Sequence, residues 1–231
     1  MTLRALIFDV DGTLAETEDL HRQAFNDTFA SEGLTWNWNR DTYRDLLKTT
    51  GGKERMRAHA DKHNIAFTAE DAAQLHAIKT RRYADLVDRG GLILRPGIAM
   101  LIIKAQAVGL KLAVATTTSP QNVDRLCQSC WGQPANQIFD VIAAGDEVPR
   151  KKPAPDVYQL ALNRLDLSAD QAIAFEDTAN GVQSAHAAGI RVVVTPSIYS
   201  TGEDFTGADW ILPTLLPANW TADLARLLPA A

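Results

Sequence analysis

The chain has 231 residues, of which 46% are hydrophobic and 22% charged, and its formal net charge is −5. These values are typical of a globular protein with one sizeable core plus an insert, or with two small domains. The negative charge gives no general attraction for nucleic acid or anionic membranes, so we expect neither as a partner. An anionic substrate would have to be bound by a few local cations or by a metal.

The N-terminal segment and the cysteines indicate a protein of the reducing cytoplasm. We expect no signal peptide before Asp9, and no stretch approaches the roughly 20 apolar residues that cross a bilayer. Cys127 and Cys130 form a CxxC, but no second cysteine pair or nearby histidine accompanies it. We expect two reduced packing residues on one helix, with a redox pair or half of a zinc site as the alternative.

The predicted elements begin with a buried strand over Ala5–Phe8, which ends in the polar run DVDGT. From Glu16 to about Arg89 the sequence is polar, with apolar residues at helical spacing and no candidate buried strand. After Pro96 and Gly97, predicted strands alternate with helices. The strands are predicted over 111–115, 139–143, 172–175, 192–194 and 210–212, and the helices over 98–108, 120–130, 156–165, 180–188 and 222–228.

This alternation predicts an α/β fold with a doubly wound, Rossmann-like parallel sheet covered on both faces. The polar stretch predicts a helical domain inserted after the first strand. We therefore predict a core of residues 1–15 and 94–231 and a helical domain of residues 16–93.

Polar side chains follow the predicted strands at the edge of a parallel sheet where active sites form. Carboxylate oxygens favour magnesium, and fixed cations and hydroxyls can hold the phosphate oxygens that a metal leaves free. A carboxylate can attack phosphorus, and a second carboxyl two residues on can protonate the leaving oxygen. The candidate residues at this edge are Asp9, Asp11, Gly12 and Thr13 after the first strand, Thr116, Thr117 and Thr118 after the second, and Glu176 and Asp177 after the fourth. Lys151 and Lys152 join them from the segment before the helix predicted over 156–165.

Four segments, DVDGT, VATTTS, KKPAPDVY and FEDTANG, resemble in order and spacing the four motifs of the haloacid dehalogenase (HAD) superfamily of phosphatases. The resemblance covers the whole chain. It implies Asp9 as nucleophile and Asp11 as general acid and base. It also implies phosphate binding by Thr116 and Lys152. The implied magnesium ligands are Asp9, the Asp11 carbonyl and Asp177, with Glu176 helping, often through water, and the helical domain resembles the mobile cap of the family.

The closer resemblance is to the CbbY-like phosphatases, which include enzymes that hydrolyse xylulose 1,5-bisphosphate, an inhibitory by-product of rubisco. It rests on DGTLAETEDLHRQAFN, on the WNWNRDTYRDLLKTTGGKERM region and on LRPGIAMLI with LAVATTTS. The resemblance implies a small phosphorylated sugar as substrate and a place beside the Calvin cycle. The β-phosphoglucomutases share the core and a similar cap, so a mutase or a broader sugar-phosphate phosphatase is the alternative. No protein partner is evident.

Several assignments stay open. Glu176 and Asp177 could also cap the helix near Asn180. Thr117 and Thr118 could contact phosphate or be structural, and Lys151 is expected to be solvated. Trp36 and Trp38 are expected to pack inside the cap, while Lys79, Arg81, Arg82, His59, His63, His76 and His186 are expected at the surface. The candidate substrate residues of the cap are Glu18, His21, Tyr43, Arg44, Gly52, Lys53 and Arg55, of which at least one cation should hold a second phosphate.

Overall fold

The computed structural model describes residues 2–90 and 92–228 and divides into two compact units. The α/β unit comprises Met1–Glu16 and Leu92–Ala231, and the helical unit comprises Thr17–Gly91. The helical unit is thus inserted in the chain shortly after the first strand of the α/β unit. No helix among the described residues has the length and apolar character that a membrane span requires.

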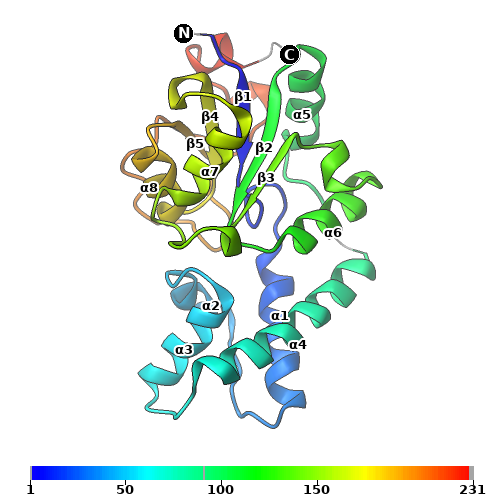
Figure 1. The fold of residues 1–231 in the computed structure, drawn as a ribbon, viewed down its shortest axis with the longest axis vertical. Helices are drawn as coiled ribbons and strands as arrows, with labels where there is room; N and C mark the ends of the chain where they lie inside the picture. Colours follow the sequence, from blue (N-terminus) through cyan, green and yellow to red (C-terminus); the bar gives the residue numbers. More distant parts are fainter. Residues whose placement is uncertain (1, 91, 229–231) are drawn as a thin grey trace. The chain divides into compact units, whose positions relative to one another are not determined.

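The α/β unit is built on a sheet of six strands in the order β3-β2-β1-β4-β5-β6, and every neighbouring pair is parallel. β1 lies between β2 and β4 (Figure 1), so the chain fills one side of the sheet and then the other. The predicted doubly wound α/β class is therefore confirmed. The strands are β1 (Ala5–Phe8), β2 (Lys111–Thr116), β3 (Val141–Ala144), β4 (Ala172–Glu176), β5 (Arg191–Val194) and β6 (Trp210–Ile211).

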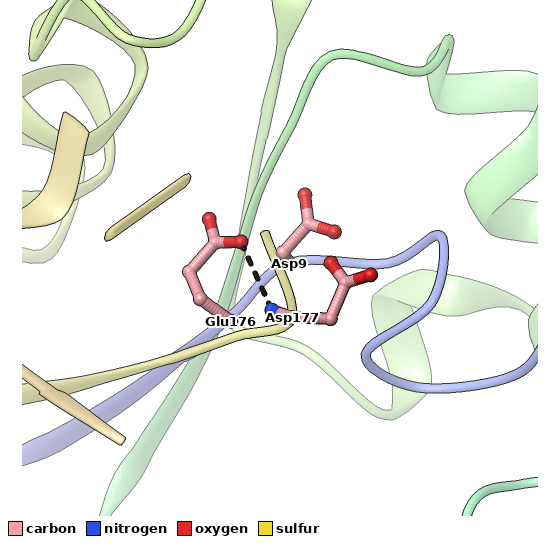
Figure 2. Close-up of side chains that lie close together, drawn as sticks. All are labelled: Asp9, Glu176 and Asp177. Atoms are coloured by element: carbon pink, nitrogen blue, oxygen red, sulfur yellow. Dashed lines mark hydrogen bonds between the residues drawn. The ribbon is translucent and has the colours of Figure 1, made fainter. Parts of the chain in front are cut away.

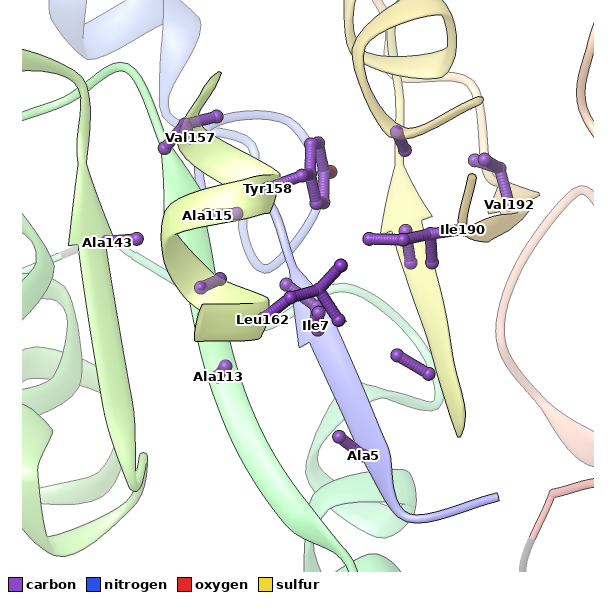
Figure 3. Close-up of a cluster of buried hydrophobic side chains, with 14 of the residues drawn as sticks. Ala5, Ile7, Ala113, Ala115, Ala143, Val157, Tyr158, Leu162, Ile190 and Val192 are labelled. Carbon is purple, nitrogen blue, oxygen red and sulfur yellow. The ribbon is translucent and has the colours of Figure 1, made fainter. Parts of the chain in front are cut away.

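Helices cover both faces of this sheet. Alternation along β1 turns Ala5 and Ile7 toward one face, where they meet Val157 and Leu162 of one helix in a cluster of buried side chains (Figure 3). On the other face Phe8 stacks on Phe175, with ring centroids 4.7 Å apart. The helices of this unit are α5 (Ile98–Ala107), α6 (Pro120–Trp131), α7 (Asp156–Leu165) and α8 (Ala179–Ala187), with short 3-10 turns at Ala135–Gln137, Gly145–Glu147, Ala169–Gln171, Pro217–Asn219 and Leu224–Arg226.

The helical unit has its own aromatic core. Trp38 is fully buried, lies 4.8 Å from Phe25 and 4.7 Å from Phe29 between ring centroids, and donates from Nε1 to His59. Trp36 packs edge-on against Phe29. Both tryptophans therefore pack inside the unit, as their sequence positions predict. Its helices are α1 (Glu18–Ser31), α2 (Arg40–Leu47), α3 (Gly52–Lys62) and α4 (Ala69–Asp88).

Two surface predictions for this unit are wrong. His59 is buried because its ring packs against both tryptophans and accepts the hydrogen bond of Trp38. Lys79 is also buried, and its ammonium lies over the rings of Phe25 and Tyr83. The rings that cover them come from the connection between α1 and α2 (Trp36 and Trp38), from α1 (Phe25) and, for Lys79, from Tyr83 one turn along its own helix.

The predicted helix over 222–228 is a single 3-10 turn at Leu224–Arg226. Asp223, just before this turn, accepts hydrogen bonds from Trp210 Nε1 at 2.8 Å and from Thr221 Oγ1 at 2.5 Å. The segment is therefore attached to β6 through a side chain, and a regular helix does not develop.

Candidate active site

Two neighbouring strand ends bring three carboxylates together. β1 and β4 are paired with Phe8 beside Phe175, and the Asp9 N–H donates to the Phe175 carbonyl at 3.0 Å. This register places Asp9 next to Glu176 and Asp177, which end β4 and follow it (Figure 2). All three are buried, and a carboxylate oxygen from each lies within 4.8 Å of the others. Parallel pairing of β1 and β4 thus brings the carboxylates of two motifs that are distant in sequence into one acidic cluster.

A buried lysine faces this cluster. Lys152 is buried, and its Nζ donates to Asp9 Oδ1 and to Glu176 Oε1, both at 2.6 Å. The Tyr158 hydroxyl donates to the same Glu176 oxygen at 2.5 Å. Burial opposes the charge of Lys152, but the carboxylates of Asp9 and Glu176 outweigh it and raise the lysine pKa. Lys152 therefore stays protonated across the physiological range.

The acidic cluster carries more negative charge than Lys152 balances. Burial raises the pKa of Asp9 to about 8, with Glu176 adding to the shift and Lys152 opposing it. Burial and the charges of Asp9 and Glu176 also raise the pKa of Asp177 well above its ordinary value. A hard divalent cation would supply the missing positive charge and restore ionised carboxylates. This donor set, buried oxygens with an excess of negative charge, fits such an ion.

Two glycines allow the backbone to approach these carboxylates closely. A Cβ at Gly12, where φ is +84°, would overlap the Asp177 carboxylate, and a Cβ at Gly181 would overlap the Glu176 carboxylate. The Thr13 hydroxyl also donates to Asp177 Oδ1, at 3.4 Å. The glycines of DVDGT and FEDTANG are thus required by close packing around the acidic groups.

The hydroxyls after β2 have distinct surroundings. Thr116 is buried, and its Oγ1 accepts from the Thr118 N–H at 3.2 Å. Thr118 Oγ1 accepts from the Asn122 side chain at 2.9 Å, while Ser119 caps α6 by accepting from the Asn122 N–H. Thr117 and Asp11 are half-buried. Since β2 is paired with β1, Thr116 stands on the strand beside the one that Asp9 follows.

Two open questions at this edge of the sheet have structural answers. The residue that caps α8 is Thr178, whose side chain accepts from the Gly181 N–H, so neither Glu176 nor Asp177 is the cap. Lys151, which we expected to be solvated, is instead half-buried, and its Nζ lies 3.8 Å from Asp146 Oδ1.

Three of the candidate cap residues form one hydrogen-bonded cluster within the helical unit. The Tyr43 hydroxyl donates to Glu18 Oε2 at 2.8 Å and accepts from Arg55 Nη1 at 2.9 Å. Arg55 also donates to the Leu46 carbonyl at 3.3 Å and is buried. Arg55 is therefore engaged inside the unit.

The other cap candidates lie outside this cluster. His21 is buried, stacks on Tyr83 with centroids 3.8 Å apart and has its Nδ1 2.5 Å from Lys79 Nζ. Arg44 is exposed and pairs with Asp41 at 3.1 Å, while Lys53 is half-buried. A Cβ at Gly52 would lie 2.6 Å from the His76 ring, so any larger residue at the first position of α3 would have to displace that ring. Among the three cap cations, Arg44 and Lys53 are the more accessible.

Sequence analysis missed three residues that contact the acidic cluster or its loops. Tyr158 lies in the KKPAPDVY segment but gives no local signal of its contact with Glu176. Ser197, whose hydroxyl opposes the rise that burial causes in the pKa of Asp177, follows β5, where the same strand-end rule could have found it. Arg95 donates to carbonyls far away in sequence, which no local pattern predicts.

Residues 6–195 match the family model described as haloacid dehalogenase-like hydrolase, and the chain belongs to this family. It is therefore a hydrolase with a HAD-type α/β core, as the sequence motifs predict. Protein CbbY from Rhodobacter capsulatus is 56% identical over 94% of this chain and 96% of its own length. Protein CbbY from Cereibacter sphaeroides is 50% identical over 99% of this chain and 100% of its own length.

Solved structures extend this similarity. The crystal structure of CbbY from Rhodobacter sphaeroides in complex with phosphate has a TM-score of 0.90 and 50% identity, over 96% of this chain and 99% of that one. A mutant of that CbbY, in complex with xylulose 1,5-bisphosphate, matches equally well. A β-phosphoglucomutase from Clostridium difficile, at 19% identity, has a TM-score of 0.78 over 93% of this chain and 92% of that one and shares the fold.

Proposed function

We propose that this protein is a magnesium-dependent phosphatase of sugar phosphates that hydrolyses xylulose 1,5-bisphosphate to xylulose 5-phosphate and phosphate. The observation that carries the proposal is the buried cluster of Asp9, Glu176 and Asp177 facing Lys152. The similarity to CbbY proteins, one of them bound to this bisphosphate, supports the choice of substrate. Removal of a rubisco inhibitor would be the physiological task.

The proposed reaction uses two carboxyl groups in turn. Asp9 attacks phosphorus, a new O–P bond forms, and the bond from phosphorus to the sugar oxygen breaks. Asp11 gives its proton to that oxygen. Water then attacks the aspartyl-phosphate, Asp11 takes a proton from the water, and the Asp9 carboxylate is released with inorganic phosphate. Asp11 thus ends each cycle in the protonation state in which it began.

The remaining residues would hold the phosphoryl group and the ion. Asp9, the Asp11 carbonyl and Asp177 would bind magnesium, with Glu176 assisting through water, and Thr116, Thr117 and Lys152 would hold phosphate oxygens. When bound, the ion supplies positive charge that stabilises the phosphoryl oxygens in the transition state. The Lys152 contact with Asp9 already places an ammonium beside the nucleophile.

We also propose that residues 16–93 act as a cap that closes on the substrate and keeps water away until the aspartyl-phosphate has formed. Glu18, His21, Tyr43, Gly52 and Arg55 would shape its substrate face. Because Arg55 is engaged with Tyr43, we assign the second phosphate to Arg44 or Lys53.

The test is phosphate release with magnesium from xylulose 1,5-bisphosphate, ribulose 1,5-bisphosphate, β-glucose 1-phosphate and simple sugar monophosphates. We expect kcat/KM to favour xylulose 1,5-bisphosphate strongly over its ribulose epimer. Comparable rates on all four would contradict the substrate assignment, and conversion of β-glucose 1-phosphate without phosphate release would indicate a mutase. Asp9→Asn should abolish turnover, whereas Asp170→Asn, an exposed aspartate of the same unit, should not.

A further inference from the structure

Arg95 is a nearly buried cation that donates to several chain segments at once. Its side chain is 10% exposed, and its Nε lies 3.3 Å from Glu16 Oε1. Nη1 donates to the Gly12 carbonyl and, at 2.7 Å, to the Thr195 carbonyl, while Nη2 donates to the Pro196 carbonyl at 2.7 Å. One guanidinium therefore joins the loop after β1 to the loop after β5.

The backbone that carries Arg95 is itself fixed. The Arg95 N–H donates to the Leu14 carbonyl at 2.8 Å, and Leu94 is paired with Ala15 in an antiparallel bridge. On the other side of Arg95, a Cβ at Gly97 would overlap the Leu215 backbone, so this turn packs tightly. The backbone of Arg95 is therefore held on both sides. Hydrogen bonds from its guanidinium can restrain the positions of the two loops.

The two loops that Arg95 joins, one after β1 and one after β5, flank the Asp177 carboxylate, and we call them its walls. On one side, Gly12 approaches Asp177 so closely that no Cβ fits, and Thr13 donates to Asp177 Oδ1. On the other side, Ser197, the residue after Pro196, lies beside Gly12 as Asp177 does, and its hydroxyl opposes the rise that burial causes in the pKa of Asp177. Burial raises the pKa of Asp177 and the charge of Arg95 opposes that shift, while the guanidinium donates to the backbone carbonyls of both walls.

We propose that Arg95 is a positioning residue that fixes the Asp177 carboxylate for metal binding by clamping these two loops together. The inference rests on the proposed function, because it requires that Asp177 binds magnesium. Partners that orient a metal ligand commonly change affinity by about 10-fold to 100-fold when they are lost. The planar fork of arginine serves several acceptors in fixed directions, which the ammonium of lysine does not reproduce. Magnesium affinity should therefore depend on the planar geometry of the guanidinium and not on its charge alone.

The experiment compares Arg95→Lys and Arg95→Met with the control Arg164→Met. Arg164 also donates to a backbone carbonyl, that of Ile142 at 2.6 Å, and to the Glu147 carboxylate, but it touches neither wall. Magnesium binding to the purified full chain is measured by isothermal titration calorimetry without substrate. We expect affinity about tenfold or more weaker for both Arg95 variants and unchanged for the control. Wild-type affinity in Arg95→Lys would overturn the proposal.

A second variant covers the case in which Arg95→Met does not fold. Ser197→Ala removes the hydroxyl of one wall and should also weaken magnesium binding. Because both changes act on the same carboxylate, the loss in the double variant Ser197→Ala with Arg95→Lys should be smaller than the product of the single losses. A loss equal to that product would show independent actions and overturn the clamp.

Activity separates this inference from the proposed function. In Arg95→Lys, raising the magnesium concentration should restore kcat toward the wild-type value, which a residue that takes part in the chemistry would not allow. If Arg95→Lys binds magnesium and releases phosphate at the same magnesium concentrations as wild type, the proposed role of Arg95 is wrong and the proposed function stands. If wild type binds no magnesium, the proposed function fails and the clamp with it.

Discussion

Gly181 provides a test of how tightly the acidic cluster is packed, because two effects of one substitution have opposite signs. Replacing glycine by alanine in a helix normally stabilises a protein by about 0.5–1 kcal/mol. At Gly181 the new Cβ would overlap the Glu176 carboxylate, which Lys152 and Tyr158 hold in place. Overpacking of this kind costs about 1–3 kcal/mol, so the clash should prevail.

We therefore expect Gly181→Ala to lower both the melting temperature and phosphatase activity. The control is Ala187→Gly at the exposed end of the same helix, which should lower stability by only about 0.5–1 kcal/mol and leave activity unchanged. Thermal unfolding and phosphate release measure the two effects. A Gly181→Ala protein that is more stable than wild type and fully active would show that Glu176 can move freely.

Individual site residues could be predicted from sequence when a local rule places them. Asp9, Glu176 and Asp177 each follow a strand predicted from sequence, and the structure brings their carboxylates together. Tyr158 and Arg95 were missed because their acceptors come from segments that only the finished fold brings near. The burial of Lys79 has the same cause in part, since Phe25 of α1 covers its ammonium together with Tyr83, which lies one turn along the same helix. Contacts made across the fold leave no periodic signal.

The two cysteines of α6 are free thiols placed in the packing of one helix. Burial raises the pKa of Cys127 to about 12, and burial also raises the pKa of Cys130. The thiolate is the reactive form, so native thiols should react slowly.

With Ellman's reagent at pH 8, we expect Cys127 and Cys130 to react far more slowly in the native protein than in urea, and each thiol to be counted once after unfolding. The variant Cys130→Ser isolates the buried Cys127, which should be the slower of the two. Rapid native reaction, or a count below two after unfolding without reductant, would instead support a redox pair.

Most helices and strands could be predicted because their boundaries carry local signals. Helix α7 has the predicted bounds 156–165, and strand β1 the predicted bounds 5–8. Strand β4 extends one residue further than predicted, to Glu176, because a polar side chain can end a paired strand without breaking its backbone hydrogen bonds. The helix prediction for residues 222–228 was wrong because Asp223 accepts a hydrogen bond from Trp210, a partner that periodicity does not reveal.

The two units keep separate cores, and the cluster of three buried carboxylates lies in the α/β unit. The aromatic cluster around Trp38 stabilises the helical unit, whereas the sheet and its four helices stabilise the α/β unit. The α/β unit also buries Asp9, Glu176 and Asp177, and Lys152 donates to two of these three carboxylates. Burying like charges with too little compensation destabilises the folded state. Global stability should therefore depend on the ion that the proposed function requires.

Magnesium should raise the melting temperature of the whole protein, because an ion that binds only the folded state adds RT ln(1 + [Mg²⁺]/Kd) to the free energy of unfolding. At a hundredfold excess over Kd this is about 2.7 kcal/mol, which corresponds to about 5–10 °C for a chain of this size. Differential scanning fluorimetry with magnesium, and again after excess EDTA, measures the shift and its reversal. Asp177→Asn should abolish the shift and Asp170→Asn should retain it. An equal shift in wild type and Asp177→Asn would place the stabilising ion elsewhere and contradict the proposed ligand set.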